Sequence, residues 1–373
     1  MLYIAYYTTS DDARISSPAA NEKIKSISKA IGENGIPVKI LSTCTVASKG
    51  RFIRGRKFNL FKNVTCKQYP LFNTSFGPFR RLQYIWASIK IFFTLLFCVK
   101  KGENVLFYHA IERIPPIKLA KKIKKFRLIL EVEEIYANAR KLKEREVKRE
   151  RQIFEMADAY IFPTELLNKK INEENKPYCV IHGTYEPRPI LAEPLKDKVH
   201  VVYAGTLDAT KGGAGLAVES AKFLDKGFHV HILGFGEDYL VKDIKDKIFE
   251  CSSKTDCTVT YDGCLSGDEY TTFLQKCHVG LSTQNVDGKF NDTSFPSKIL
   301  TYMANGLKVV TGRIPVVETS AVNDNVFYYD EQSPEKIAQA IKDAVTSNVC
   351  DGRQKLLKLR EEFKKDVTKV LEK

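Results

Sequence analysis

The chain contains 373 residues, of which 43% are hydrophobic and 28% are charged. This length exceeds one ordinary hydrophobic core and favours two domains, and the composition is typical of a folded globular protein, which excludes a mainly disordered chain. Lysine and arginine outnumber aspartate and glutamate by 59 to 45, which gives a formal net charge of +14. We therefore expect an anionic partner: nucleic acid, an anionic membrane face or a phosphorylated small molecule.

The nine cysteines are scattered without a CxxC pair, and no histidine stands at zinc-finger spacing. This pattern disfavours a disulfide framework and a structural zinc site, and it is typical of a protein in a reducing cytosol. The first seven residues lack the basic lead-in and long apolar core of a secretory signal. We predict a cytoplasmic protein.

The N-terminal segment predicts a βαβ unit, with a strand over Leu2–Tyr7, a helix that follows Ser16-Ser17 and ends near Gly35, and a strand over Ile36–Leu41. Open α/β sheets bind ligands in the loop between the carboxyl end of a strand and the next helix. Ser16 and Ser17 are therefore candidate ligand-binding residues.

The next segment, 42–77, is aromatic and basic without clear periodicity, and predicts a long loop or a pair of short strands. The segment Leu82–Val99 is apolar enough to raise the question of a membrane span, but Gln83, Ser88 and Lys90 interrupt it and basic residues flank both ends. We expect a largely buried helix of an α/β layer. An interfacial helix on a bilayer is the alternative.

The βαβ pattern continues to residue 181. The predicted strands are Asn104–His109, Arg127–Val132, Ala159–Phe162 and Tyr178–Ile181, and the predicted helices are Ile117–Phe126, Ala137–Ala157 and Thr164–Glu174. Three candidate catalytic residues stand at strand ends: His109, Glu131 and Glu133. On a strand, Glu131 and Glu133 share one face, and two neighbouring carboxylates can raise a pKa for general-base work. A structural histidine and solvated loop acids are the alternatives.

A segment with three prolines, 186–194, is the best linker candidate, and the α/β alternation starts afresh beyond it. The predicted organisation is an N-terminal Rossmann-like domain over 1–186, a linker over 187–198, a second Rossmann-like domain over 199–350, and a C-terminal helix over 351–373 that packs back on the first domain.

Two segments of the second half are suited to a phosphate. Gly205-Thr206 with Lys211 follows its first strand, where glycine lets the backbone approach a diphosphate and lysine adds a charge. An ordinary glycine turn is the alternative, since neither a Walker A nor a G-x-G-x-x-G motif is present. In segment 291–306 a helix is expected to open at Ser297-Lys298, with Thr293 or Ser294 as its cap, and to end at Gly306.

Both segments lie at carboxyl ends of strands in one predicted sheet, which favours a shared diphosphate site. The predicted donor-binding residues are Gly205, Thr206, Lys211, Gly234, Thr293, Ser294, Phe295, Pro296, Ser297 and Lys298.

In their order and spacing, the segments 201–212, 230–236, 259–263 and 294–310 resemble the donor-binding half of GT-B glycosyltransferases, the retaining family 4 in particular. Segment 17–23 is similar to a loop of bacterial polysaccharide glycosyltransferases. The resemblance implies two Rossmann-like domains facing a cleft, with a nucleotide sugar held by the second domain and the acceptor by the first.

In the family, catalysis consists largely of stabilising the departing nucleoside diphosphate. The resemblance therefore implies that Lys211, Lys298 and the amides near Ser297 hold the donor diphosphate without a metal ion. It also implies that His109 approaches the transferred sugar, and it puts Ser16 and Ser17 on the acceptor side.

The chain departs from the family where it replaces the usual paired glutamates by Thr293 and Thr301 and an arginine by Thr206. The donor contacts must therefore differ from those of the family.

We predict a glycosyltransferase of the hexosyltransferase class, with retention of configuration, that acts in polysaccharide biosynthesis. It moves a sugar from a UDP-linked donor to a cell-surface glycan or a lipid-linked acceptor, without cofactor or metal. An anionic membrane surface at the inner face of the plasma membrane is a candidate partner, and nucleic acid is not, because no nucleic-acid motif is present. The alternative is a non-catalytic polyanion- or membrane-binding protein with a degenerate glycosyltransferase fold.

Overall fold

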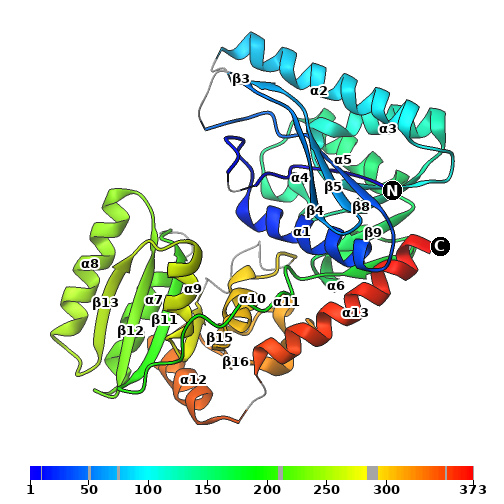
Figure 1. Cartoon of the computed structure of the whole chain (residues 1–373). Helices are drawn as coiled ribbons and strands as arrows, with labels where there is room; N and C mark the ends of the chain where they lie inside the picture. The colour runs from blue at the N-terminus through cyan, green and yellow to red at the C-terminus, as the bar shows by residue number, and fades with distance from the viewer. Residues whose placement is uncertain are drawn as a thin grey trace. The chain divides into compact units, whose positions relative to one another are not determined.

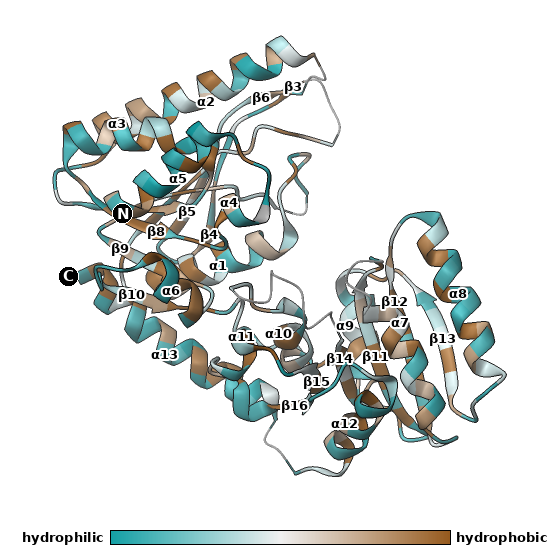
Figure 2. Cartoon of the chain, turned by 180° about the vertical axis from the view of Figure 1, so that it is seen from behind, coloured by the Kyte–Doolittle hydropathy of each residue, from teal (hydrophilic) through white to brown (hydrophobic). Residues whose placement is uncertain are grey.

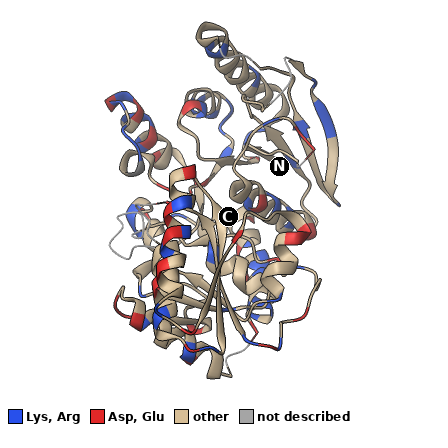
Figure 3. Ribbon diagram, turned by 90° about the vertical axis from the view of Figure 1, so that its left-hand side faces the viewer, with Lys and Arg blue, Asp and Glu red and all other residues tan. Residues whose placement is uncertain are grey.

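The computed structural model describes residues 1–9, 11–48, 52–73, 76–208, 213–283, 293–348 and 351–372. It divides into two compact units, Met1–Thr184 with Glu361–Lys373, and Tyr185–Arg360. Each unit is built on a mainly parallel sheet with helices beside it (Figure 1). The predicted linker segment, 186–194, contains no helix or strand. Positively charged and negatively charged side chains are interspersed along the helices (Figure 3).

The sheet of the first unit has the strand order β10-β9-β8-β7-β1-β2-β5-β4. Neighbouring strands are parallel except at the edge, where β4 is antiparallel to β5. The central strands are almost wholly buried, as expected for a parallel sheet between two helical layers. The strands are β1 (Leu2–Ala5), β2 (Val38–Ser42), β4 (Arg56–Phe61), β5 (Val64–Gln68), β7 (Asn104–Tyr108), β8 (Arg127–Glu131), β9 (Ala159–Phe162) and β10 (Tyr178–Val180).

Local signals explain the helix ends of this unit. Helix α1 (Pro18–Glu33) begins with Ser17 as N-cap, whose side chain accepts a hydrogen bond from the Ala20 N–H, and with a proline in its first turn. The other helices are α2 (Gly77–Cys98), η1 (Ile111–Arg113), α3 (Ile114–Lys124), α4 (Tyr136–Ala139), α5 (Glu144–Met156) and α6 (Glu165–Ile171).

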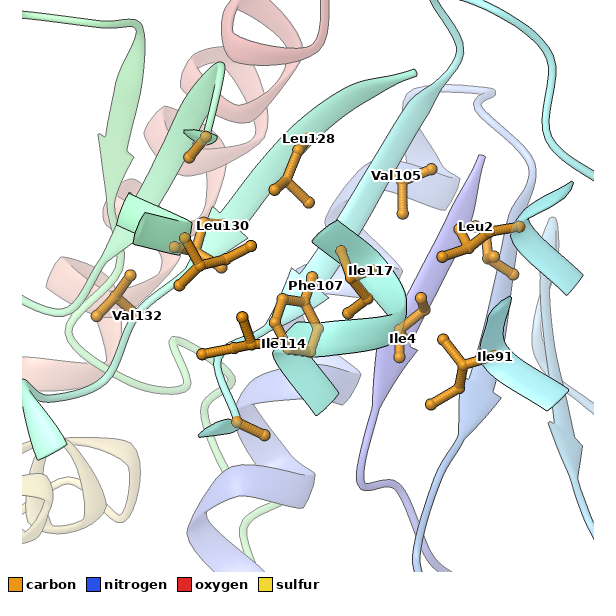
Figure 4. Close-up of a cluster of buried hydrophobic side chains, with 14 of the residues drawn as sticks. Leu2, Ile4, Ile91, Val105, Phe107, Ile114, Ile117, Leu128, Leu130 and Val132 are labelled. Carbon is orange, nitrogen blue, oxygen red and sulfur yellow. The ribbon is translucent and has the colours of Figure 1, made fainter. Parts of the chain in front are cut away.

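The core of the first unit lies between the sheet and helices α2 and α3. Aliphatic side chains of β1, β7 and β8 meet Ile91 of α2 and Ile114 and Ile117 of α3, and all of these are buried (Figure 4). Apolar burial of this kind contributes about 25 cal/mol per Å² and accounts for the stability of this layer.

The end of the chain belongs to this unit as well. Helix α13 (Gly352–Glu372) passes from the second unit into the first at Glu361. Arg127 Nη1 donates to the Val370 carbonyl at 2.6 Å, and Lys364 Nζ lies 3.3 Å from a Glu33 carboxylate oxygen. These contacts fix the end of α13 to the first unit.

Two local predictions are wrong. Beyond the end of β2, the described residues of segment 42–77 form four strands, among them β3 (Phe52–Ile53) and β6 (Leu71–Phe72), which pair with each other, and β5, which extends the main sheet. The single charged helix expected over 137–157 is two helices, α4 and α5, because the backbone is extended at Arg140. Segment 42–77 has no clear apolar–polar alternation, which hid its strands.

The expectation of a largely buried helix at Leu82–Val99 is also wrong. Helix α2 buries only Ile91 and Leu95. Apolar residues recur along its length (Figure 2), and several are exposed, including Trp86 at 58% and Phe97 at 79%. By length and composition alone, α2 is the one helix among the described residues that is long and apolar enough to cross a membrane.

The sheet of the second unit is parallel throughout, in the order β13-β12-β11-β14-β15-β16. Its strands are β11 (Val199–Thr206), β12 (Phe228–Phe235), β13 (Thr258–Gly263), β14 (Val279–Ser282), β15 (Lys308–Gly312) and β16 (Val326–Tyr329). Its helices are α7 (Gly213–Ser220), η2 (Ala221–Phe223), α8 (Asp238–Ser252), α9 (Gly267–Gln275), α10 (Ser297–Ala304), α11 (Pro315–Glu318), η4 (Asn323–Asn325) and α12 (Pro334–Thr346). The predicted alternation of strands and helices is confirmed.

Candidate functional site

The carboxyl ends of β11 and β12 approach each other closely in the second unit. Gly205 and Gly234 are register partners in these strands. A Cβ atom on Gly234 would lie 2.1 Å from the Gly205 carbonyl oxygen, so only glycine allows this approach. The structure thus brings together two of the predicted donor-binding residues, with Thr206 exposed at the end of β11 beside them.

Helix α10 is held over this edge by Tyr302, which sequence reasoning missed. The Tyr302 hydroxyl accepts a hydrogen bond from the Ala204 N–H at 2.8 Å and donates to the Leu281 carbonyl at 3.2 Å. Its ring occupies the space above Gly280, where a Cβ atom would lie 2.3 Å from the ring. Tyr302 therefore links α10 to both β11 and β14.

This anchoring places the Lys298 ammonium at the end of β11. Its Nζ lies 3.8 Å from the centroid of the Tyr203 ring. A Cβ atom on Gly205 would lie 2.5 Å from Lys298 Nζ, so the ammonium rests directly against the glycine backbone. The structure brings Gly205 and Lys298 together, as the sequence predicts. Lys211 lies outside the described residues.

The predicted cap of α10 is wrong. The N-cap is Pro296, whose side chain makes no capping hydrogen bond, so the N-cap is neither Thr293 nor Ser294. Both of these residues and Phe295 are half-buried in the segment that leads into the helix. A helix start presents backbone N–H groups and the positive end of the helix dipole, and proline at the N-cap offers no side-chain oxygen to them, which suits an anion.

The C-terminal end of α10 is closed by a hydrogen bond from a side chain, whereas its first turn carries an exposed residue. Gly306 has a φ of +85°, which confirms the predicted left-handed exit, and Arg353 Nη2 donates to the Asn305 carbonyl at 2.8 Å. At the first turn, the side chain of Ser297 is exposed, and its carbonyl accepts a hydrogen bond from the Thr301 hydroxyl at 3.1 Å. Thr301 is therefore engaged within its own helix.

In the first unit, buried Glu131 and half-buried Glu133 form an acidic pair beside Lys23 of α1. Glu131 ends β8, is fully buried and accepts a hydrogen bond from the Tyr3 hydroxyl. Burial, and next the charge of Glu133, raise the pKa of Glu131 to about 8, so this carboxyl is protonated at pH 7. Glu133 is partly exposed, and Lys23 Nζ lies 2.6 Å from its carboxylate.

Lys23 was missed as a partner of these acids. It is only 5% exposed. A lysine in an amphipathic helix is normally expected on the solvated face, so the sequence contained no signal for its burial.

His109 lies deeper than expected. Its ring is 1% exposed, lies 4.8 Å from the ring of Tyr136, and places Nε2 3.5 Å from a carboxylate oxygen of Glu150. Burial lowers the pKa of His109 to about 3, so the imidazole is neutral at pH 7. Its role as a group that approaches the sugar stays a prediction.

The two candidate acceptor residues precede α1. The hydroxyls of Ser16 and Thr8 lie 2.7 Å apart, and Ser17 is the exposed N-cap. Ser16 is therefore hydrogen-bonded to Thr8 in the loop after β1. Ser17 caps α1, the helix that carries Lys23.

A cavity of about 1030 Å³ lies beside the carboxyl ends of β1 and β7 in the first unit. Helices α2 and α3 supply most of its apolar wall, and its charged residues come from α2, η1 and the segment of α4 and α5. The apolar residues include Ile85, Ile89, Phe93 and Leu119, the basic residues are Arg81, Arg140, Arg145 and Arg149, the acidic residues are Glu112 and Glu146, and Tyr6, Tyr108 and Tyr136 also line it. Such a lining suits an amphiphilic, negatively charged ligand.

Residues 198–347 match the protein family described as glycosyl transferases group 1. The whole chain is similar to the E. coli structure described as "Trehalose-6-phosphate from E. coli bound with UDP-2-fluoro glucose", with 11% identity, a TM-score of 0.58, and coverage of 97% of this chain and 95% of the other. It is also similar to Anabaena Alr3699/HepE in complex with UDP, at 10% identity and a TM-score of 0.61, with coverage of 100% and 97%.

The lipopolysaccharide outer core galactosyltransferase WaaB is similar at 13% identity and a TM-score of 0.60, with coverage of 100% of this chain and 99% of WaaB. No curated protein sequence matches the chain. The predicted GT-B fold, with two Rossmann-like domains, is confirmed by these likenesses. Together with the family match, this fold supports glycosyl transfer as the reaction.

Proposed function

We propose that this chain transfers a sugar from a nucleotide-sugar donor, and that the second unit holds the donor diphosphate. The observation that carries the proposal is the Lys298 ammonium resting against Gly205, in the first turn of a helix whose N-cap is a proline. The two phosphates of a departing nucleoside diphosphate develop negative charge as the sugar leaves. A fixed cation and helix amides stabilise that charge, and no metal ion is required at this position.

The donor is UDP-linked in this proposal. Two of the similar structures contain UDP or a UDP-sugar, as their descriptions state. The threonines at 293 and 301 make the ribose and sugar contacts differ from those of family 4, so the proposed UDP specificity rests on the fold and the phosphate site.

The acceptor in this proposal is a glycan, lipid-linked or at the cell surface, bound by the first unit. The cavity beside β1 and β7 offers an apolar wall for a lipid or a sugar face and arginines for a phosphate. Glu133, partly exposed and next to buried Glu131, is the better placed of the two acids to meet an acceptor hydroxyl. Retention of configuration and the catalytic roles of His109, Glu131 and Glu133 remain part of the proposal.

The first unit also binds an anionic bilayer in this proposal, at the cytoplasmic membrane surface. The exposed apolar side chains of α2 stand next to basic residues at both ends of the helix, which matches the chemistry of an anionic lipid surface. The helix lies on the bilayer and does not cross it, because Ile91 and Leu95 are packed in the core of the first unit.

The membrane proposal predicts that Trp86→Ser combined with Phe97→Ser lowers binding to vesicles containing phosphatidylserine by about tenfold or more, since each exposed aromatic contributes apolar area. Phe249→Ser is the matched control, because Phe249 is 82% exposed on α8 of the second unit. Co-sedimentation with vesicles measures the effect. Equal binding by the double variant and the control would reject α2 as the lipid-binding element.

The donor proposal is tested by thermal unfolding of the full chain with a panel of nucleotide sugars, followed by detection of released UDP. A ligand present at 100 times its Kd stabilises the folded state by about 2.7 kcal/mol, which raises the Tm by about 5 to 10 °C. We expect this shift with UDP and with one or more UDP-sugars, in the presence of EDTA. The absence of any shift across the panel would contradict the proposal.

A further inference from the structure

Three histidines meet on one face of the second unit's sheet, at the amino-terminal ends of β11 and β12. Register pairs His200 with His229, and His231 follows on the same face two residues later. One ring nitrogen of each histidine lies within 4.8 Å of those of the other two. Gly205 and Gly234 stand at the opposite ends of the same strands, so this cluster is separate from the phosphate site.

Two carboxylates fix the tautomers of His200 and His231. His200 Nε2 lies 3.0 Å from Asp197 Oδ1, and His231 Nδ1 lies 3.1 Å from Asp262 Oδ2. An ionised carboxylate only accepts hydrogen bonds, so each ring carries its proton on the nitrogen that faces the acid. The other two nitrogens, His200 Nδ1 and His231 Nε2, face each other at 2.9 Å, each with a lone pair.

The third ring is oriented through a hydroxyl. The Thr260 hydroxyl donates to Asp262 Oδ2 at 2.9 Å, and its oxygen lies 3.0 Å from His229 Nε2. His229 therefore donates from Nε2 and keeps the lone pair on Nδ1.

Facing lone pairs require a positive charge between them. His200 is 3% exposed and His231 is 7% exposed, so water screens them little. Zinc binds imidazole nitrogens at 2.0–2.1 Å in tetrahedral geometry, which sets two such ligands about 3.3 Å apart. The observed 2.9 Å is therefore within a few tenths of an ångström of that spacing. Histidine ligands that donate their other N–H to a carboxylate are typical of protein zinc sites.

We propose that His200, His229 and His231 bind a divalent transition-metal ion, with Zn²⁺ favoured and water as the fourth ligand. Asp197 and Asp262 orient two of the ligands from outside. His229 is only half-buried, so the ion has a path from solvent. The ion joins the starts of β11 and β12 and stabilises the second unit. This inference does not depend on glycosyl transfer.

A zinc site here contradicts the expectation of no structural zinc, which rested on the spacing of cysteines and histidines along the chain. The ligands are 29 and 31 residues from His200, as their numbers show, and only the parallel register brings them together.

The test uses the full chain, first freed of metal by a chelator and then equilibrated with Zn²⁺ or Co²⁺. We expect about one equivalent of zinc by elemental analysis, a Tm higher by about 5 to 10 °C with zinc at 100 times its Kd, and the visible absorption of tetrahedral Co²⁺. His231→Asn keeps a donor toward Asp262 but lacks the atom at Nε2. His200→Gln likewise keeps an atom toward Asp197 but lacks the one at Nδ1. Both variants are expected to lose the metal and the Tm shift.

The matched control is His278→Asn. His278 Nδ1 accepts a hydrogen bond from the His200 backbone N–H at 3.0 Å, and asparagine retains an acceptor there. We expect this variant to bind zinc as the wild type does. The proposal is overturned if the wild type takes up no zinc, which would leave a proton between His200 and His231, or if His231→Asn and His200→Gln retain the same zinc content as the wild type.

Discussion

Replacement of Lys298 by alanine is expected to weaken UDP binding by about 10- to 150-fold, because a hydrogen bond to a charged group contributes about 1.5–3 kcal/mol. Turnover of the donor is expected to fall further, by about 100- to 1,000-fold in kcat/KM, since the charge on the phosphates grows in the transition state. The fold itself should change little, because the contact of Lys298 with the Tyr203 ring contributes about 1 kcal/mol or less. Calorimetric titration with UDP and the rate of UDP release measure the two effects.

Two further variants make this prediction specific. Gly205→Ala keeps the lysine but places a Cβ atom 2.5 Å from its Nζ, so the flexible side chain must move off the strand end. We expect a comparable loss of UDP binding with an unchanged Tm. Lys242→Ala removes an exposed lysine of α8 and serves as the control for lost charge. If Lys298→Ala binds UDP as tightly as Lys242→Ala does, the diphosphate lies elsewhere.

The pattern of strands and helices was predictable in the second unit because each parallel strand is a short apolar run between turn residues. The helix α10 and its glycine exit at Gly306 followed from the same local rules. The first unit was harder, because β4 is an edge strand that carries arginine and lysine, and because α2 presents apolar side chains to solvent. Sequence patterns assume that apolar residues are buried, and α2 breaks that rule.

The candidate site was predictable only in part. Local sequence identified Gly205 at the end of a strand and Lys298 in the first turn of a helix, whereas Tyr302 and Lys23 act through contacts with residues far along the chain. The position of Tyr302 in the helical pattern predicts an ordinary core residue. The neighbouring sequence contains no signal for the two hydrogen bonds of its hydroxyl. The expected cap of α10 failed for a related reason, since the backbone before Ser297 sets which residue can reach the first turn.

The buried acid Glu131 should make the stability of the chain depend on pH. Its pKa is about 8 in the folded state against an ordinary 4.5, so the folded protein binds a proton that the unfolded protein releases between these two values. The stability from this group is fully present below pH 4.5 and is lost as the pH rises through 8. The loss amounts to about 5 kcal/mol at most, from about 1.4 kcal/mol for each unit of pKa.

Glu131→Gln removes this dependence, because the amide keeps an acceptor for the Tyr3 hydroxyl and cannot ionise. Between pH 5 and pH 8.5, the free energy of unfolding of the wild type is expected to fall by several kcal/mol relative to this variant. Denaturant unfolding at fixed pH values measures it, and Glu144→Gln, an exposed acid of α5, is the control that should follow the wild type. Parallel curves for Glu131→Gln and the wild type would mean that Glu131 is ionised at pH 7. A buried pair of charged carboxylates beside Lys23 would then replace the neutral acid, and the general-base prediction would extend to both Glu131 and Glu133.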